Sequence, residues 1–184
     1  MKFKTFLAGC LGGLLSLNSC TNSPDMTDYA AYVNPFIGTG GHGHTFPGAI
    51  VPHGMISPSP DTRIDGWDAC SGYYYADSTI NGFSHTHLSG TGCCDYGDVL
   101  LMPTVGEQKY LPTGSQSQQM AYASAFSHQN ETAEPGYYSV FLDTYQVKAE
   151  LTASKRAAIH RYTFPDLSST WITACNDRLT PRWK

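Results

Sequence analysis

The chain has 184 residues, with 11 Lys and Arg against 15 Asp and Glu and a formal charge of −4. Charged residues make up only 14% of the chain, against about 25% in an average soluble domain. This composition excludes a coiled coil, a basic nucleic-acid-binding protein and a highly charged disordered tail. The length predicts one domain, and the 18 glycines, 12 tyrosines and 11 prolines favour a β-rich, loop-rich extracellular protein.

Residues 1–19 have the organisation of an export signal. Lys2 and Lys4 form a basic start, and residues 6–17 form an apolar stretch. That stretch is too short for a membrane-spanning helix, which needs about 20 residues. We therefore expect the signal to be removed during export.

Residues 17–20 (Leu-Asn-Ser-Cys) resemble a bacterial lipobox, in which a small residue precedes a cysteine that is lipidated and at which the signal is cleaved. The sequence thus predicts a lipid anchor at Cys20, a polar tether over residues 20–28 and a folded domain over residues 29–184. The corresponding location is the periplasm or outer membrane of a Gram-negative bacterium. A lipobox-like sequence at residues 7–10 and a plain secretory signal are the alternatives.

Lipidation of Cys20 would leave four cysteines in a compartment that permits disulfides. They are Cys70, Cys93, Cys94 and Cys175. Four cysteines allow three pairings, and a bridge between the adjacent Cys93 and Cys94 would be strained. The sequence leaves the pairing open.

Residues 38–97 differ in composition from the rest of the chain. They hold 12 of the 18 glycines and five of the seven histidines, but a single basic residue, Arg63. Glycine allows positive φ angles and close approach of a ligand to the backbone, and His, Trp and Asp supply directional polar groups. We therefore expect long Gly-rich loops that face a ligand at the edge of a β scaffold.

Strand patterns follow this segment. The expected strands are residues 99–102, 137–142, 145–152 and 159–164. Residues 145–152 alternate between apolar and polar side chains, so one face of this strand is buried and the other is wet. Pro103 is expected to end the first strand, Asp143 and Thr144 predict a hairpin turn, and residues 120–127 form at best a short helix. These elements predict a mainly β fold, an antiparallel β-sandwich with few helices.

Two pairs of histidines are spaced by two residues, His42 with His44 and His85 with His87. On a strand, both imidazoles of a pair would face the same side and could begin a metal site with Asp or Cys as further ligands. The spacing is weak evidence, because the chain has no CxxC, no HExxH and no third ligand at a diagnostic spacing. Hydrogen bonds to loop backbone and contacts with sugar hydroxyls are the alternatives.

The segment that contains Arg63, Trp67 and Asp68 carries the most suggestive cluster of side chains. A sugar ring offers a polar rim and an apolar C–H face, which suit carboxylate and guanidinium groups beside an exposed indole. The alternative is a buried Trp with an Asp–Arg pair that holds a loop in place. Chemistry alone gives the two interpretations equal weight.

Two enzyme classes are disfavoured. Residues 38–43 superficially resemble a phosphate-binding loop, but no Lys-Ser or Lys-Thr follows and no strand–loop–helix pattern surrounds them. Ser71 and Ser89 lie outside a GxSxG sequence, which disfavours a serine hydrolase.

Several ungapped motifs between residues 30 and 165 occur in a familiar order. They are YVNPFIGTG at 32–40, HGHTFPGAIVP at 42–52, SPDTR at 59–63, GWDACSGY at 66–73, GFSHTHLSGTG at 82–92, PGYYSV at 135–140, KAELTA at 148–153 and HRYTFP at 160–165. Together they resemble the amino-terminal domain of glycoside hydrolase family 92, a family of calcium-dependent, inverting exo-α-mannosidases.

The resemblance implies a β-sandwich followed by a larger helical domain that carries the general acid, the general base and most calcium ligands. On that basis this chain supplies no catalytic residue and no metal ligand. It would close the terminal-mannose pocket with Arg63, Trp67, Asp68, His85 and His87. The implied partners are mannose-containing glycans, for example α-1,2-linked ones, the helical catalytic domain and, through the lipid anchor, a membrane, but no nucleic acid.

This sequence departs from the family pattern at Ala69, where the family has an aromatic residue, and at Tyr74, where it has His. The match fades after Pro165, and the chain ends in a basic tail. The sequence therefore predicts a sandwich that is incomplete after about residue 165, in a truncated chain that is inactive alone. A free-standing carbohydrate-binding lipoprotein without catalysis is the alternative.

Overall fold

A computed structural model of the chain describes residues 27–63, 66–93, 96–109, 120–166 and 169–175. The export signal, Cys20, most of the tether, Cys94 and the basic tail lie outside the described residues. In the part of the chain that the structure describes, no helix has the length and apolar character needed to cross a membrane.

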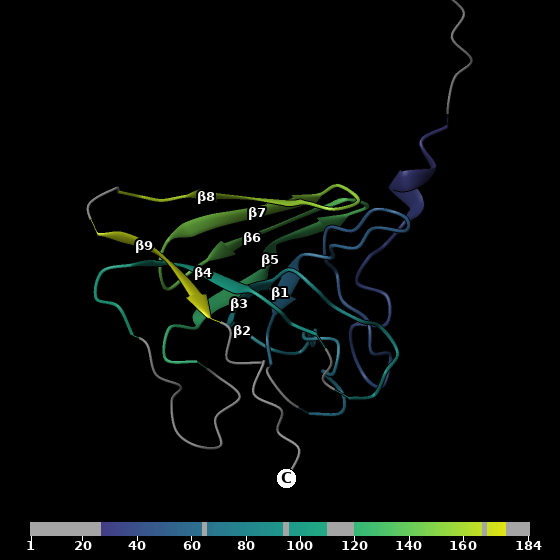
Figure 1. Ribbon diagram of the computed structural model, residues 1–184, viewed down its shortest axis with the longest axis horizontal. Coiled ribbons are helices and arrows are strands. Elements are labelled where there is room, and N and C mark those ends of the chain that lie inside the picture. The colour runs from purple at the N-terminus through teal and green to yellow at the C-terminus, as the bar shows by residue number, and fades with distance from the viewer. Residues whose placement is uncertain (1–26, 64–65, 94–95, 110–119, 167–168, 176–184) are drawn as a thin grey trace, which may run out of the picture.

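The described residues form two antiparallel sheets that pack as a sandwich (Figure 1). The four-stranded sheet has the order β1 (Ser59–Asp61), β3 (Gly82–Ser84), β4 (Leu100–Val105) and β9 (Thr170–Cys175). The five-stranded sheet has the order β2 (Thr79–Ile80), β5 (Ser124–Glu134), β6 (Tyr137–Leu142), β7 (Val147–Ala153) and β8 (Ala158–Thr163). A short 3-10 helix, η1 (Tyr29–Tyr32), precedes them, so the predicted sandwich with few helices is confirmed.

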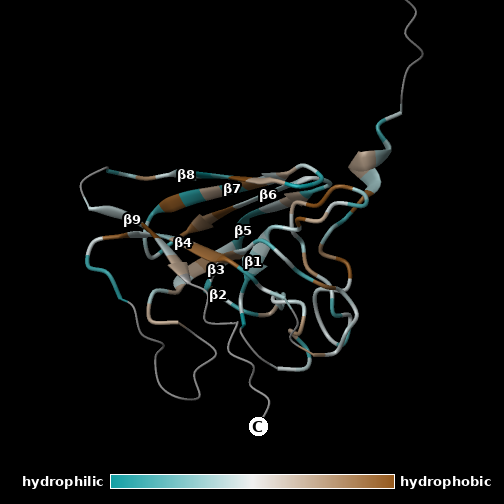
Figure 2. Cartoon of the chain, viewed as in Figure 1, coloured by the Kyte–Doolittle hydropathy of each residue, from teal (hydrophilic) through white to brown (hydrophobic). Residues whose placement is uncertain are grey.

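The core lies between the two sheets and is built from both. Phe83 and Met102 come from the four-stranded sheet, and Tyr138, Val140 and Leu151 come from the five-stranded sheet; all five are almost fully buried. Figure 2 shows hydrophobic stretches on β4 and β6 where the two layers meet. Apolar side chains on facing strands thus supply the main driving force for the fold.

The strands after residue 137 follow the sequence pattern closely. β6 has the predicted bounds, and β7 and β8 begin and end within two residues of the expected ones, with a turn over residues 143–146 between β6 and β7. In β7, Val147, Ala149 and Leu151 are buried as the alternation predicts. Glu150 is buried as well, against the expectation of a wet face, because neighbouring side chains bind its carboxylate.

Two expectations about local structure are wrong. Residues 120–127 contain no helix: Met120 forms a single bridge, and β5 begins at Ser124. β4 does not end before Pro103 but continues to Val105, paired with β9. Among the described residues, β4 pairs with β3 only at Leu101, so beyond that point one edge of β4 faces no described strand of this sheet and tolerates a residue without an N–H.

A bulge in β5 determines which of its side chains enter the core. The pairing of β5 with β6 shifts in register between Phe126 and Glu131. These two residues are five apart, so a regular strand would place them on opposite faces. Between these two pairs β5 advances five residues while β6 advances only two, so β5 carries three extra residues here. This irregularity lets both side chains point inward, and the carboxylate of Glu131 is thereby buried.

Candidate functional site

Three loop segments meet beside the four-stranded sheet. The carbonyl oxygen of His44 accepts a hydrogen bond from the backbone N–H of Gly90 at 2.9 Å. The carbonyl oxygen of the next residue, Thr45, accepts one from the hydroxyl of Ser71, also at 2.9 Å. The histidine-rich loop, the segment after Gly66 and the loop after β3 are therefore held together, although they are far apart in sequence.

Trp67 lies at this meeting point with its indole largely in solvent, at 62% exposure. The ring contacts the edge of the His44 imidazole, with 5.0 Å between centroids and an interplanar angle of 83°. It also lies against Gly92, where an added Cβ would come within 2.6 Å of the indole atoms Cη2 and Cζ3. An exposed aromatic ring fixed by two loops is suited to contact the apolar face of a sugar ring.

Two histidines and one carboxylate gather beside Trp67. Nδ1 of His42 lies 2.5 Å from Oδ1 of Asp68, and His42, His44 and Asp68 each offer one ligand atom within 4.8 Å of the other two. The side chain of His42 is exposed, whereas His44 is buried at 8% exposure. Two imidazoles with one carboxylate do not suit Ca²⁺, which prefers six to eight oxygen ligands.

Arg63 has a different environment. Its guanidinium binds the carboxylate of Asp77 through three hydrogen bonds of 2.7, 2.8 and 3.0 Å, and lies 4.5 Å above the ring of Tyr74. These contacts raise the pKa of Arg63, chiefly through the hydrogen bonds to Asp77. The Arg–Asp pair thus holds the loop between the two residues, while Trp67 remains exposed. The structure thus combines features of both interpretations: an Asp–Arg pair that holds a loop, and an indole exposed to solvent.

His87 is directed into the protein interior. Its imidazole is 1% exposed, with Nδ1 2.8 Å from the carbonyl oxygen of Ser57 and Nε2 within 3.2 Å of both Ser84 Oγ and Asp61 Oδ1. The hydroxyl of Ser84 donates to Asp61 at 2.5 Å. A Ser–His–Asp catalytic triad needs the carboxylate on the nitrogen opposite the serine and an accessible hydroxyl. Here Ser84 and Asp61 share one nitrogen and both are fully buried, so these three residues do not have the arrangement of a catalytic triad.

His85 lies near the edge of the five-stranded sheet. Its Nδ1 is 2.8 Å from the carbonyl oxygen of Val99, and its ring stacks on His160 of β8 at 4.7 Å. Burial, with a smaller effect of His85, lowers the pKa of His160 to about 4. Among the described residues, His85 contacts Val99 and His160 of β8, and His87 contacts Phe46, Ser57 and residues of β1 and β3. Neither histidine has a hydrogen bond or ring contact with Trp67 or Asp68 in this part of the chain.

Glu131 forms the centre of a buried polar cluster. Its carboxylate, 1% exposed, accepts hydrogen bonds from the hydroxyls of Tyr73 and Tyr138, and lies 2.6 Å from Nδ1 of His128. Burial and the carboxylate raise the pKa of both tyrosines well above the ordinary value. The cluster ties β5 and β6 to the segment that follows Trp67, and so supports the loops at the site.

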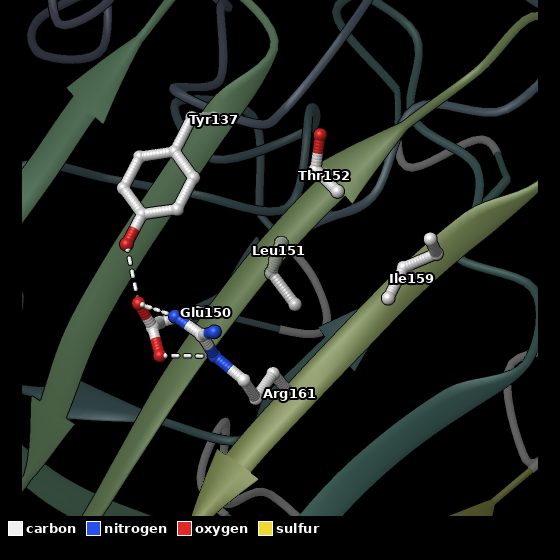
Figure 3. A pocket seen from close by; sticks show the side chains of 6 residues that line it. All are labelled: Tyr137, Glu150, Leu151, Thr152, Ile159 and Arg161. Atoms are coloured by element: carbon white, nitrogen blue, oxygen red, sulfur yellow. Dashed lines mark hydrogen bonds and ion pairs between the residues drawn. The ribbon is translucent and has the colours of Figure 1, made fainter.

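A separate hollow of about 320 Å³ lies over β6, β7 and β8 (Figure 3). Its polar groups bind one another: Glu150 accepts from the hydroxyl of Tyr137 at 2.7 Å and from Arg161 through two bonds of 2.7 Å. The hydrogen bonds from Arg161 and Tyr137 lower the pKa of Glu150 to about 2. A carboxylate held ionised in this way is unsuited to act as a general acid.

Of the five residues predicted to contact substrate, the structure brings together Trp67 and Asp68 and gives Arg63, His85 and His87 other partners. The five substrate-contact assignments stay predictions. Three further residues at the site, His42, His44 and Gly92, were absent from the predicted set. His42 and His44 had a signal in the His-x-His spacing, and Gly92 had none beyond the glycine content of its segment.

Most of the chain is similar in sequence to known proteins. The model of the glycosyl hydrolase family 92 N-terminal domain matches residues 32–181. A protein described as an uncharacterised secreted glycosidase, from Arthroderma benhamiae, is 32% identical over 139 residues, which is 75% of this chain and 18% of that protein.

Solved structures give the same result. The family GH92 α-mannosidase BT3965 from Bacteroides thetaiotaomicron, in complex with mannoimidazole, is 46% identical with a TM-score of 0.74, over 79% of this chain and 19% of that one. The GH92 inverting mannosidase BT2199 from the same organism is 33% identical with a TM-score of 0.66, over 79% and 19%. The GH92 glycosyl hydrolase ccman5 is 36% identical with a TM-score of 0.65, over 78% and 20%. The chain therefore spans about a fifth of the length of these relatives.

Proposed function

Since the chain belongs to glycoside hydrolase family 92 and corresponds to its amino-terminal domain, we propose that it forms one wall of a terminal-mannose pocket in an exported α-mannosidase. The observation that carries the proposal is the exposed indole of Trp67 beside the His42–Asp68 pair. Two of the similar structures are described as α-mannosidases or inverting mannosidases. The reaction is then the inverting hydrolysis of terminal α-mannose from glycans.

The chemistry of this wall suits a pyranose. The indole offers a flat apolar surface for the C–H face of the sugar. Oδ2 of Asp68, on the carboxyl group that binds His42 through Oδ1, is an acceptor for a sugar hydroxyl. His42 is exposed and can turn toward the ligand. We therefore assign apolar stacking to Trp67 and hydroxyl contacts to Asp68 and His42.

Hydrolysis itself is assigned to a helical catalytic domain outside this chain. An inverting glycosidase needs two carboxyl groups about 6.5–9.5 Å apart, one as acid and one as base. The carboxylates of Asp61, Asp77, Glu131 and Glu150 are each held by hydrogen bonds to neighbouring side chains. The 184-residue chain alone is therefore expected to be inactive, and the calcium ligands are expected on the helical domain.

Export is supported by two observations. The first 19 residues have the pattern of an export signal, and one relative is described as a secreted glycosidase. From the lipobox-like sequence that ends at Cys20 we further propose a lipid anchor, at a membrane of a Gram-negative bacterium. Labelling of the expressed protein with a fatty-acid analogue, lost on Cys20→Ser, tests the anchor.

Calorimetric titration of the chain with methyl α-mannoside tests the pocket wall. We expect binding at millimolar concentration or tighter that is lost in Trp67→Ala. Trp171→Ala is the matched control, because Trp171 is another exposed indole, on β9. Equal binding in both variants, or no binding by the folded chain, would contradict the proposal.

Turnover is measured separately, on α-mannosides with and without Ca²⁺. We expect none from this chain alone and restored turnover when the helical domain is added. Clear turnover by the chain alone would refute the assignment of catalysis to the other domain. Sugar binding that the helical domain neither strengthens nor converts into hydrolysis would favour the free-standing binding protein instead.

A further inference from the structure

His42, His44 and Asp68 bring two imidazoles and one carboxylate to one point on the surface. Their three ligand atoms lie within 4.8 Å of one another, and the hydrogen bond from Gly90 to the carbonyl oxygen of His44 anchors the backbone of the loop that carries both histidines. In a tetrahedral zinc site, bonds of about 2.0–2.1 Å place neighbouring ligand atoms roughly 3.3 Å apart. The side chain of His42 is exposed, so its rotation can bring the imidazole nitrogen to the shorter separation that such a site requires.

His44 supplies an independent observation. Its side chain is buried at 8% exposure, yet its Nε2 atom has no hydrogen-bond partner. A buried polar atom without a partner is costly and calls for a structural explanation. The backbone of His44 also has a φ of 53°, in the left-handed region that is uncommon for residues other than glycine. A bound cation would explain why an imidazole is held in this position.

We propose that His42, His44 and Asp68 form a binding site for a divalent transition-metal ion, of which Zn²⁺ is the best match. Imidazole nitrogen with one carboxylate is a donor set typical of zinc and neighbouring first-row metals, whereas Ca²⁺ prefers oxygen donors only. Three protein ligands leave one coordination position for water or for a hydroxyl group of a ligand resting on Trp67. The metal binds here whether or not the chain also takes a sugar.

In the absence of a metal, the same groups form a hydrogen-bonded His42–Asp68 pair with His44 beside it. The two states differ in a measurable way: a metal site needs all three side chains, and the hydrogen-bonded pair needs only two. The imidazole of His44 has no hydrogen bond to His42 or Asp68 among the described contacts. Loss of metal binding when His44 is replaced therefore distinguishes a metal site from the hydrogen-bonded pair.

Titration of the full chain with Zn²⁺ tests the proposal, with cysteine thiols alkylated beforehand so that they do not compete. We expect one equivalent to bind, with the affinity reduced at least tenfold in His42→Ala, His44→Asn and Asp68→Asn. His53→Ala is the matched control, because His53 is an exposed histidine with nearly the same left-handed φ of 56°. If His44→Asn fails to fold, the exposed His42→Ala variant still decides the question.

Co²⁺ gives a second readout that does not depend on stoichiometry. Co²⁺ bound at His44 lies next to the Trp67 indole, since the two rings are 5.0 Å apart, and should quench its fluorescence. The quenching is expected to disappear in Trp67→Phe and in Asp68→Asn, and to persist in Trp171→Phe. Metal binding of equal affinity in all histidine and aspartate variants, or no quenching that depends on Trp67, would overturn the proposal.

Discussion

The indole of Trp67 lies so close to Gly92 that a Cβ at position 92 would come within 2.6 Å of its Cη2 atom. Gly92 also has a φ of +70°, which is readily adopted only without a side chain. The orientation of the exposed ring is therefore set by a glycine on another loop, together with the edge contact from His44.

Gly92→Ala should displace the indole and weaken the affinity for methyl α-mannoside about tenfold, which corresponds to roughly 1.4 kcal/mol. The variant combines a strained backbone with a steric clash against the ring. Calorimetry of the variant measures the affinity, and thermal unfolding shows whether the fold persists.

Gly90→Ala separates the two effects. Gly90 has a similar φ of +78°, but an added Cβ there would meet nothing within 4 Å. Gly90→Ala should lower the free energy of unfolding by about 1–2 kcal/mol, because alanine is strained in the left-handed backbone conformation. Its affinity for methyl α-mannoside should change little. If Gly90→Ala weakens sugar binding as much as Gly92→Ala does, the clash with the Trp67 indole does not cause the loss of affinity.

Arg63→Lys should destabilise the fold by about 1–2 kcal/mol, because lysine cannot reproduce the fork of hydrogen bonds to Asp77 or the stacking on Tyr74. Arg161→Lys is the control: it alters a similar paired arginine, bound to Glu150 but largely exposed, and its effect should be smaller. Urea unfolding measures both. Unchanged stability in Arg63→Lys together with a large loss of sugar affinity would show that Arg63 contacts substrate directly.

Glu131→Gln should cost about 2–4 kcal/mol, because the amide would place a donor against the hydroxyls of Tyr73 and Tyr138 in a buried cluster. Tyr73→Phe removes one hydrogen bond and should cost only about 1 kcal/mol. The comparison is made by urea unfolding at neutral pH. A cost below that of Tyr73→Phe would mean that the buried carboxylate does not stabilise the fold.

The sequence predicts strands well where the pattern is local. Tyr137–Leu142 and Val147–Ala153 follow a period of two that depends only on neighbouring residues. β5 was missed because its bulge shifts the period and turns Glu131 inward. The burial of Glu150 was also missed, because it depends on Arg161, which lies opposite it on the next strand.

The candidate site shows the same limit. Trp67 and Asp68 are adjacent in sequence, and their chemistry is visible there. Their association with His42 and His44 depends on loop contacts between distant segments, such as the hydrogen bond from Gly90 to His44. A composition rich in Gly and His indicates that loops face a ligand, but not which residues meet.

Stability should decrease as the pH falls from about 6.5 to 4, in part because of His160. Burial and the adjacent His85 lower the pKa of His160 to about 4, whereas the unfolded chain takes up this proton near pH 6.5. The unfolded state then binds more protons throughout this interval, so unfolding becomes more favourable as the pH is lowered.

His160→Gln should reduce the loss of unfolding free energy between pH 6.5 and 4.5 by about 1–2 kcal/mol. This range allows for the partial exposure of the His160 ring. The free energy of unfolding in urea at the two pH values measures it. An equal slope in wild type and His160→Gln would show that this imidazole does not remain neutral in the folded chain.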